Sequence, residues 1–276
     1  MKVYLKTKDY TLTQESFELL HDPVLDMLIT EPQPGNLGKY YESEDYISHT
    51  DARKSLVDKM YYTVKRYNLK RKLSLIASYT SDKRLLDVGA GTGDFLAMAK
   101  KYGWEVTGLE PNELARLKAG EKGIQLLEGL DAVPTGLKFE VITLWHVLEH
   151  IPDLEAQISK LVELLTENGV LVVAVPNFKS YDAKHYKEYW AAYDVPRHLW
   201  HFSKKSIQGI FAKQGMKLLK SKPMIFDAFY VALLSEKYKN GKQNFIRAFW
   251  IGLMSNIRAM DSKEYSSLIY VLKRVE

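Results

Sequence analysis

A glycine-rich turn within residues 84–111 constrains the fold of this chain more than any other stretch. The apolar run over 85–88 is typical of a buried parallel strand. Glycines alternate with small residues over 89–93, and the spacing of an amphipathic helix follows. A second apolar strand, over 104–109, ends at Glu110. This order of strand, glycine turn, helix, strand and acid is that of a nucleotide-binding βαβ unit.

The glycine turn departs from the common nucleotide fingerprints. In the dinucleotide pattern G-x-G-x-x-G a third glycine allows close packing, but Asp94 stands at that position. A P-loop is also excluded, because no lysine follows these glycines. Asp87 and Asp94 would repel a pyrophosphate and suit a ligand with a cationic amine and a sulfonium. Since Glu110 can accept hydrogen bonds from both ribose hydroxyls, the ligand that fits is S-adenosylmethionine.

The stretch LLDVGAGTGDFL, with its flanking strand, helix and acid, resembles the glycine motif of class I S-adenosylmethionine-dependent methyltransferases. Residues 55–220 are similar to the branch that contains the ubiquinone-biosynthesis O-methyltransferases. LWHVLEHIPD, over 144–153, resembles that branch's motif after the fourth strand. The resemblance implies S-adenosylmethionine as cofactor and S-adenosylhomocysteine as product. The cofactor-binding residues it implies are Asp87, Gly89, Ala90, Gly91, Gly93, Glu110, Pro111, Gly129, Leu130, Asp131, Trp145 and His146.

Strands and helices alternate along the rest of the chain, which predicts a parallel sheet with right-handed crossovers. We expect an α/β fold with a Rossmann-like, seven-stranded, mostly parallel sheet and helices on both faces. Further strands are expected at 124–127, 139–145, 170–175, 216–220 and 267–273, and helices at 51–79, 156–165 and 204–214. Asp51 is placed as an N-cap, and Asn168 with Gly169 as a helix stop.

Two regions lie outside that regular alternation. Residues 1–50 are expected to form an N-terminal extension or lid with a small β element, and 51–276 the methyltransferase domain. A helical insertion is expected at about 226–260, before the last strand. The extension is similar to one that carries paired cysteines in some relatives, but Asp22 and Leu25 stand at those positions. No zinc is therefore expected there.

His146, Glu149 and His150 spell H-x-x-E-H, the signature of an inverzincin protease. Here the motif follows a strand in the register of a methyltransferase motif, so we expect neither peptidase chemistry nor an assigned metal ligand. In some quinone-pathway relatives an acid replaces His146 and a divalent ion is thought to bind. The sequence leaves open whether an ion binds near these residues.

Methyl transfer to a hydroxyl depends on positioning and on a base, and histidine suits that role. Besides His150, the stretch DVPRHLWHF over 194–202, which resembles a segment common in this branch, offers His198 and His201 as catalytic candidates. Arg197 could bind an acidic substrate group, with an ion pair to Asp194 as the structural alternative. Substrate-binding residues are also expected in the tyrosine-rich stretch before residue 50, at Tyr41 and Tyr46, which could instead be a packing arm.

Composition limits the partners. The chain has no cysteine, 39 Lys and Arg against 34 Asp and Glu, and a net charge of +5. Because the basic residues are scattered, we do not expect nucleic-acid binding. No apolar run reaches the roughly 20 residues of a membrane span, and no signal peptide is evident, which indicates a cytoplasmic protein.

The sequence therefore predicts a cytoplasmic methyltransferase (EC 2.1.1.-) that modifies a small molecule, with an oxygen as the expected acceptor atom. The alternative is a non-catalytic S-adenosylmethionine-binding protein with a regulatory or assembly role. Aromatic residues of the insertion, Phe245, Phe249 and Trp250, are open to two interpretations, a homodimer face and a substrate wall.

Overall fold

The computed structural model describes residues 1–41 and 56–275, with side chains described from residue 63 onward in the second range. Tyr46 and the expected N-cap Asp51 lie outside the described residues.

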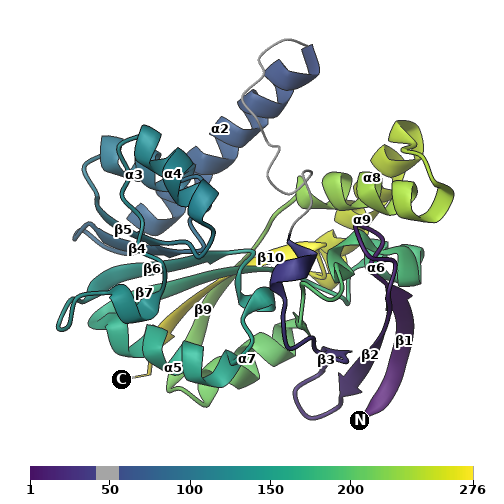
Figure 1. The fold of residues 1–276 in the computed structure, drawn as a ribbon, viewed down its shortest axis with the longest axis horizontal. Coiled ribbons are helices and arrows are strands. Elements are labelled where there is room, and N and C mark those ends of the chain that lie inside the picture. The colour runs from purple at the N-terminus through teal and green to yellow at the C-terminus, as the bar shows by residue number, and fades with distance from the viewer. Residues whose placement is uncertain (42–55, 276) are drawn as a thin grey trace. The chain divides into compact units, whose positions relative to one another are not determined.

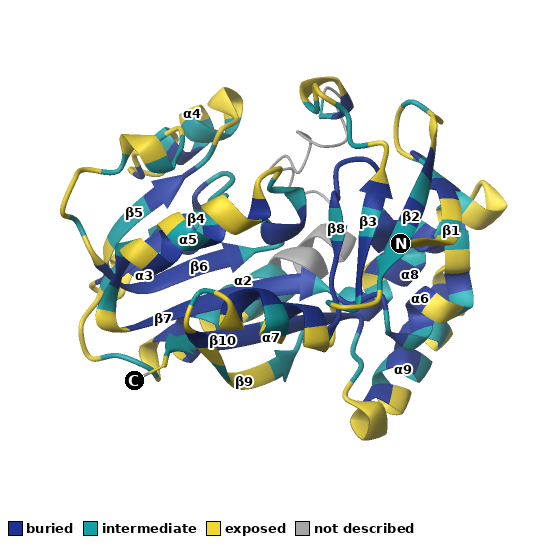
Figure 2. Cartoon of the chain, turned by 90° about the horizontal axis from the view of Figure 1, so that it is seen from below, coloured by how far each residue is buried: buried dark blue, intermediate teal, exposed yellow. Residues whose placement is uncertain are grey.

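A six-stranded sheet organises the larger part of the described chain (Figure 1). Its strand order is β5-β4-β6-β7-β10-β9, and β4 pairs in parallel with both β5 and β6. Figure 2 shows β6, β7 and β10 as mostly buried, as their apolar sequences predict. The mixed α/β architecture with a mostly parallel sheet is thus confirmed. The strands are β4 Arg84–Val88, β5 Glu105–Leu109, β6 Phe139–Trp145, β7 Leu165–Pro176, β9 Met216–Pro223 and β10 Ser267–Arg274.

The count of seven strands is not confirmed in the described part of the chain. The segment expected as a strand at 124–127 forms a single parallel bridge, between Leu127 and Leu109 of β5. The amide of Leu127 donates to the carbonyl of Gly108, and the amide of Glu110 donates to that of Leu127, both at 2.9 Å. This short segment therefore extends the sheet edge by one bridged pair, directly beside Glu110.

Eight α-helices connect the strands in the described residues: α2 Leu56–Ala77, α3 Asp94–Lys101, α4 Glu113–Glu121, α5 Leu154–Leu164, α6 Tyr181–Tyr186, α7 Lys204–Ala212, α8 Asp227–Asn240 and α9 Phe245–Ser262. Helices α8 and α9 occupy most of the stretch expected as an insertion, and α9 continues to Ser262. Asn168 and Gly169 do not end a helix, since α5 stops at Leu164 and both residues lie in β7.

A second, antiparallel sheet is built from three N-terminal strands and one short strand from later in the chain. Its order is β1-β2-β3-β8, with β1 Lys2–Lys8, β2 Ser16–Asp22, β3 Met27–Glu31 and β8 Trp200–His201. Phe17 and Leu28 of this sheet share one hydrophobic core with Phe178, Trp190 and residues of α8 and α9. The first 41 residues are therefore packed into the fold through apolar contacts.

The chain divides into two compact units. One takes in Met1–Ser43, His146–Glu155 and Val173–Val271; the other takes in Glu44–Trp145, Ala156–Val172 and Leu272–Glu276. Among the described residues, no helix combines the length and the apolar character that crossing a membrane requires.

Candidate functional site

The glycine turn lies between β4 and α3, and three of its residues adopt left-handed backbone angles. Gly89, Gly91 and Gly93 have φ values of 69°, 54° and 72°, which side chains with a Cβ rarely adopt. A Cβ on Gly93 would lie 2.9 Å from that of Ala119, whereas a Cβ on Gly91 would meet no described atom within 4 Å. Gly93 thus allows close packing against α4, and Gly91 leaves room for a ligand beside the backbone.

Glu110 follows β5 and holds this turn through its side chain. Its carboxylate accepts hydrogen bonds from the amide of Gly91 at 2.8 Å and from the amide of Asn112 at 3.0 Å. A carboxylate has about four acceptor positions, so two remain for other donors. Glu110 can therefore hold two ribose hydroxyls while it stays bonded to the turn.

Asp87, at the end of β4, is 2 % exposed and accepts a hydrogen bond from the Thr143 hydroxyl at 2.5 Å. Burial raises the pKa of Asp87 to about 7, against the opposing effects of Thr143 and Lys72. The carboxyl group of Asp87 is thus held by Thr143 of β6, and its pKa lies close to neutral pH.

Asp94 is paired with two lysines that the sequence interpretation did not include. Lys65 and Lys122 each lie 2.8 Å from its carboxylate, and Lys122 also donates to the carbonyl of Thr92 at 2.8 Å. Burial opposes ionisation, but the two lysines lower the pKa of Asp94. The turn itself has no basic residue, but α2 and the end of α4 bring two basic side chains to Asp94.

Trp145 ends β6 and supplies an indole with an unused donor. Its Nε1 is buried and has no hydrogen-bond partner among the described residues. Its ring meets that of Phe95 edge-on at 5.7 Å between centroids, and the Lys72 ammonium lies 4.3 Å from its centroid. A buried donor without a partner is costly, so Trp145 fits a place where a ligand supplies an acceptor.

Of the other residues expected at the cofactor, Gly129 leaves open space, because a Cβ there would meet no described atom within 4 Å. Leu130 and Asp131 follow in a 3₁₀ turn, and Asp131 pairs with Lys160 at 3.0 Å on the surface. The carbonyl of Pro111 accepts from Arg116 at 2.7 Å.

His146 belongs to the other compact unit and has an unusual backbone angle, with φ at 58°. Its ring lies 3.1 Å from the carboxylate of Asp227, at the start of α8, and 3.5 Å from that of Glu149. Burial alone would lower the pKa of His146, but the two carboxylates outweigh it and raise it to about 10. His146 is therefore an imidazolium at neutral pH, and no local pattern in the sequence pointed to Asp227 as its partner.

His150 lies with several of the other residues expected at the acceptor. Its Nδ1 is 3.0 Å from both the Arg197 carbonyl and the Tyr41 hydroxyl. Since a carbonyl only accepts, we assign the proton to Nδ1, which leaves Nε2 as an acceptor. Burial, followed by the charge of His198, lowers the pKa of His150 to about 4. His150 is therefore neutral at physiological pH.

The other two histidines are buried and bonded within the same unit. Nδ1 of His198 lies 2.9 Å from the Ala192 carbonyl, and Nε2 of His201 lies 2.9 Å from the Thr30 hydroxyl. Burial lowers the pKa of His201 well below its usual value.

Glu149, His150 and His198 form the group whose donor atoms could hold a metal ion, since these atoms lie within 4.8 Å of one another. Neither carboxylate oxygen of Glu149 accepts a hydrogen bond from any described residue, although His146 lies nearby.

Arg197 is fully buried and takes part in a network of ion pairs. Its guanidinium lies 2.6 Å from Asp194 and 2.9 Å from Asp9, and it donates to the Tyr40 carbonyl at 3.1 Å. The ion pair with Asp194 is the structural alternative that the sequence left open. Asp9, 188 residues away, was not predicted as a partner.

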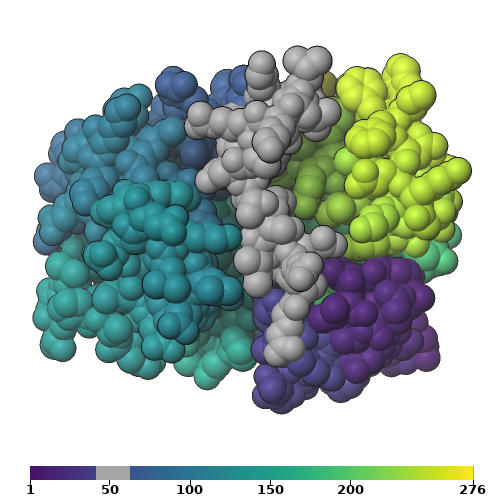
Figure 3. Space-filling model, turned by 45° about the horizontal axis from the view of Figure 1, so that its top comes forward, coloured from purple at the N-terminus to yellow at the C-terminus, as the bar shows by residue number. Residues whose placement is uncertain are grey.

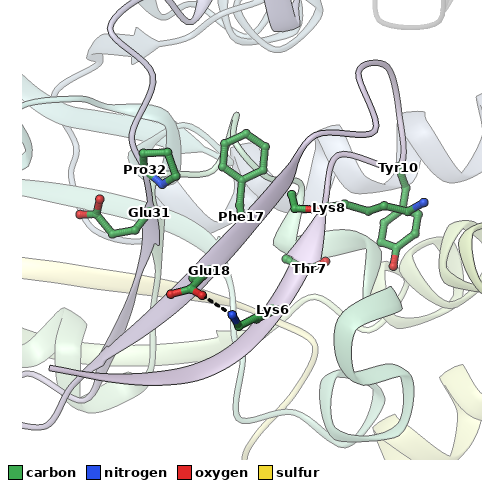
Figure 4. Close-up of a pocket in the computed structure, with 9 residues that line it drawn as sticks. Lys6, Thr7, Lys8, Tyr10, Phe17, Glu18, Glu31 and Pro32 are labelled. Carbon is green, nitrogen blue, oxygen red and sulfur yellow. Dashed lines mark ion pairs between the residues drawn. The ribbon is translucent and has the colours of Figure 1, made fainter.

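A separate pocket of about 400 Å³ lies on the N-terminal sheet (Figure 4). None of the residues predicted for the cofactor or the acceptor lines it. Its Lys6 pairs with Glu18 at 2.6 Å. Its described lining is Lys6, Thr7, Lys8, Tyr10, Ser16, Phe17, Glu18, Glu31 and Pro32.

Comparisons with known proteins agree with the geometry of the glycine turn, because they identify a methyltransferase domain. The family described as "Methyltransferase domain" matches residues 61–221. The chain is 37% identical over 114 residues to the ubiquinone biosynthesis O-methyltransferase of Histophilus somni (strain 2336), an alignment that covers 37% of this chain and 48% of that protein. It is 34% identical over 110 residues to the protein of that name from Vibrio cholerae, covering 36% and 45%. The chain thus spans about half the length of these relatives.

Among solved structures, the fold is similar to magnesium protoporphyrin IX methyltransferase from Synechocystis PCC 6803 with bound SAH. The TM-score is 0.57 at 14% identity, over 86% of this chain and 97% of that one. A possible histamine N-methyltransferase from Thermotoga maritima gives a TM-score of 0.51 at 16% identity, over 79% and 94%. At these identities the likeness concerns the fold.

Proposed function

Because the chain belongs to the methyltransferase-domain family over residues 61–221, we propose that it transfers a methyl group from S-adenosylmethionine to an oxygen atom of a small molecule. The observation that carries this proposal is the open glycine turn at Gly91 with the carboxylate of Glu110 bonded to it. The names of the relatives, which are O-methyltransferases, support oxygen as the acceptor atom.

S-adenosylmethionine is the cofactor, and the residues of the turn fit it. We propose that Glu110 accepts from the ribose hydroxyls, that the backbone of Gly91 borders the methionine portion, and that Gly129 borders the adenine. The indole N–H of Trp145 is a donor for the same ligand. Lys65 and Lys122 already neutralise Asp94. We therefore do not assign recognition of the cofactor's positive charge to Asp94 alone, but to the turn as a whole.

We propose His150 as the base that takes the proton from the acceptor hydroxyl. Its Nδ1 donates to the Arg197 carbonyl, which fixes the ring with Nε2 unprotonated. The low pKa keeps His150 neutral at pH 7 but makes it a weak base. Positioning of the activated methyl group must then supply most of the rate enhancement. Tyr41, hydrogen-bonded to the same ring, is proposed to contact the acceptor, while His198 and His201 hold the loop.

Calorimetry with S-adenosylmethionine and S-adenosylhomocysteine tests the cofactor site. Glu110→Ala should weaken binding by at least about tenfold, because a hydrogen bond to a charged group contributes about 1.5–3 kcal/mol. Glu121→Gln, which removes an exposed acid of α4, should bind like the wild type. The cofactor assignment fails if the wild-type protein binds neither compound.

Turnover separates an enzyme from a binding protein with no catalytic role. The protein is incubated with S-adenosylmethionine and a small-molecule extract, and S-adenosylhomocysteine and methylated products are followed by mass spectrometry. We expect extract-dependent product that His150→Ala reduces without loss of cofactor affinity. Tight cofactor binding with no product in any extract would favour the non-catalytic role.

A further inference from the structure

Helix α9 carries its large apolar side chains on its exposed side. Ile246 is 75 % exposed, Trp250 57 % and Met260 66 %. With Phe249 and Ile257, which are also exposed, these residues follow one another at three, four and seven positions, which places them in one stripe along the helix. We call this stripe the α9 surface; its members are Ile246, Phe249, Trp250, Ile257 and Met260, all exposed.

The fully buried positions of the same helix carry small residues, and Ile251 is half-buried against the core. Ala248, Gly252, Ser255 and Ala259 are buried, and a Cβ on Gly252 would lie 2.7 Å from the Phe229 ring of α8. The two helices therefore approach closely, and the stripe stays exposed, including Phe249, whose ring stacks on that of Phe229 at 5.6 Å. A helix of a globular protein normally has the opposite arrangement, with its large apolar residues buried. An exposed stripe of this kind marks an interaction surface.

The charge of the surrounding residues indicates what this surface binds. Residues 237–263, which include the turn between α8 and α9, hold six Lys or Arg and a single acid, Asp261. Arg247 pairs at 3.1 Å with Glu236, just before this stretch, and with Glu236 and Glu264 counted the net charge over 236–264 is +3. Lys239 and Lys242 are exposed in and beside that turn. In Figure 3 the yellow-green atoms of this segment form an exposed part of the molecular surface.

A second copy of the chain is a poor partner for such a surface. A two-fold contact brings the same patch of both subunits together, so a segment with a net positive charge would face its own copy. Lipid phosphates supply the opposite charge, and the region just below them accommodates Trp, Phe and Ile side chains. We propose that the α9 surface binds the face of an anionic lipid bilayer, with its apolar side chains at headgroup level and the lysines at the phosphates.

Co-sedimentation with vesicles tests this proposal with the full chain. We expect binding to an equimolar mixture of phosphatidylcholine and phosphatidylglycerol, weakening with added salt, and far less binding to phosphatidylcholine alone. Ile246→Ser combined with Trp250→Ser should weaken partitioning at least about tenfold. Lys239→Glu combined with Lys242→Glu should have a similar effect.

Matched controls remove the same kind of side chain elsewhere. Val24→Ser with Leu117→Ser removes two exposed apolar residues, and Lys2→Glu with Lys101→Glu reverses two exposed charges; both should bind nearly as the wild type does. All four sites are exposed, so circular dichroism should show unchanged folding. The proposal is overturned if anionic vesicles fail to bind the wild type, or if the α9 variants bind equally well. A dimer in light scattering that Ile246→Ser with Trp250→Ser dissociates would also overturn it, in favour of a second copy.

Discussion

Arg197 offers a direct test of whether a buried cation supports the fold or remains available to a ligand. Its side chain is 1 % exposed, and it bridges Asp9, which is 0 % exposed, and Asp194. Arg197→Met keeps most of the apolar stem but removes the charge, which leaves two carboxylates without their guanidinium. Removing one partner of a buried ion pair costs about 3–5 kcal/mol, because the remaining charge stays desolvated.

We therefore expect Arg197→Met to lower the free energy of unfolding by about 3–5 kcal/mol, measured in denaturant by circular dichroism. At about 2–4 °C per kcal/mol, the midpoint should fall by roughly 6–20 °C. Asp9→Asn in the Arg197→Met background should cost much less than it does in the wild type, because the two groups interact directly. A loss below about 1 kcal/mol for Arg197→Met would refute the structural role and restore Arg197 as a ligand-binding residue.

Three further perturbations test the environments of single residues. Burial raises the pKa of Asp87 to about 7 in the folded chain, so its contribution to the free energy of unfolding is complete below pH 4 and is lost as pH rises through 7. This loss is at most roughly 4 kcal/mol, and the Asp87→Asn variant should not show it when unfolding is measured across that pH range. The pKa of His146 is raised to about 10, so its ion pairs stabilise the fold fully below pH 6.5 and less as pH approaches 10. In His146→Gln the free energy of unfolding should therefore change less with pH across that range. An unchanged pH dependence would contradict the pairing with Asp227. Gly252→Ala should destabilise the protein, since the added Cβ would lie 3.0 Å from backbone atoms of Phe229. Gly120→Ala, where an added Cβ would meet no described atom within 4 Å, should instead stabilise α4 by up to about 1 kcal/mol. Equal midpoints of thermal unfolding for the two variants would be inconsistent with the packing of α8 on α9.

Local patterns were sufficient for much of the fold. The strands at 85–88 and 139–145, and the glycine turn between strand and helix, occur as predicted, because burial on both faces and left-handed angles have signatures in adjacent residues. The segment 124–127 was harder, since its pairing depends on the neighbouring edge strand, with which it forms only one bridge. Asn168 and Gly169 carried a helix-stop signal, yet they lie in β7, where pairing in the sheet overrides local preference.

The site was predictable in outline but not in its charges. Glu110 was predicted as a ribose-binding acid from its position after a strand, and that role stays a prediction; its hydrogen bond to the amide of Gly91 was not predicted. Lys122, which reaches Asp94 from 28 residues away, and Asp9, which reaches Arg197 from 188, have no signal near their partners. Such pairs depend on which helices and strands pack together, and patterns in neighbouring residues do not reveal that packing.

The sequence by itself determined the order of elements around the glycine turn and the acid that follows it, because those features depend on neighbouring residues. The tertiary structure decided the protonation of the side chains. His146 and His150 are four residues apart in one motif, yet the pKa of the first is raised to about 10 and that of the second is lowered to about 4. Burial lowers both pKa values, but the carboxylates of Asp227 and Glu149 outweigh it at His146, whereas His198 adds to it at His150.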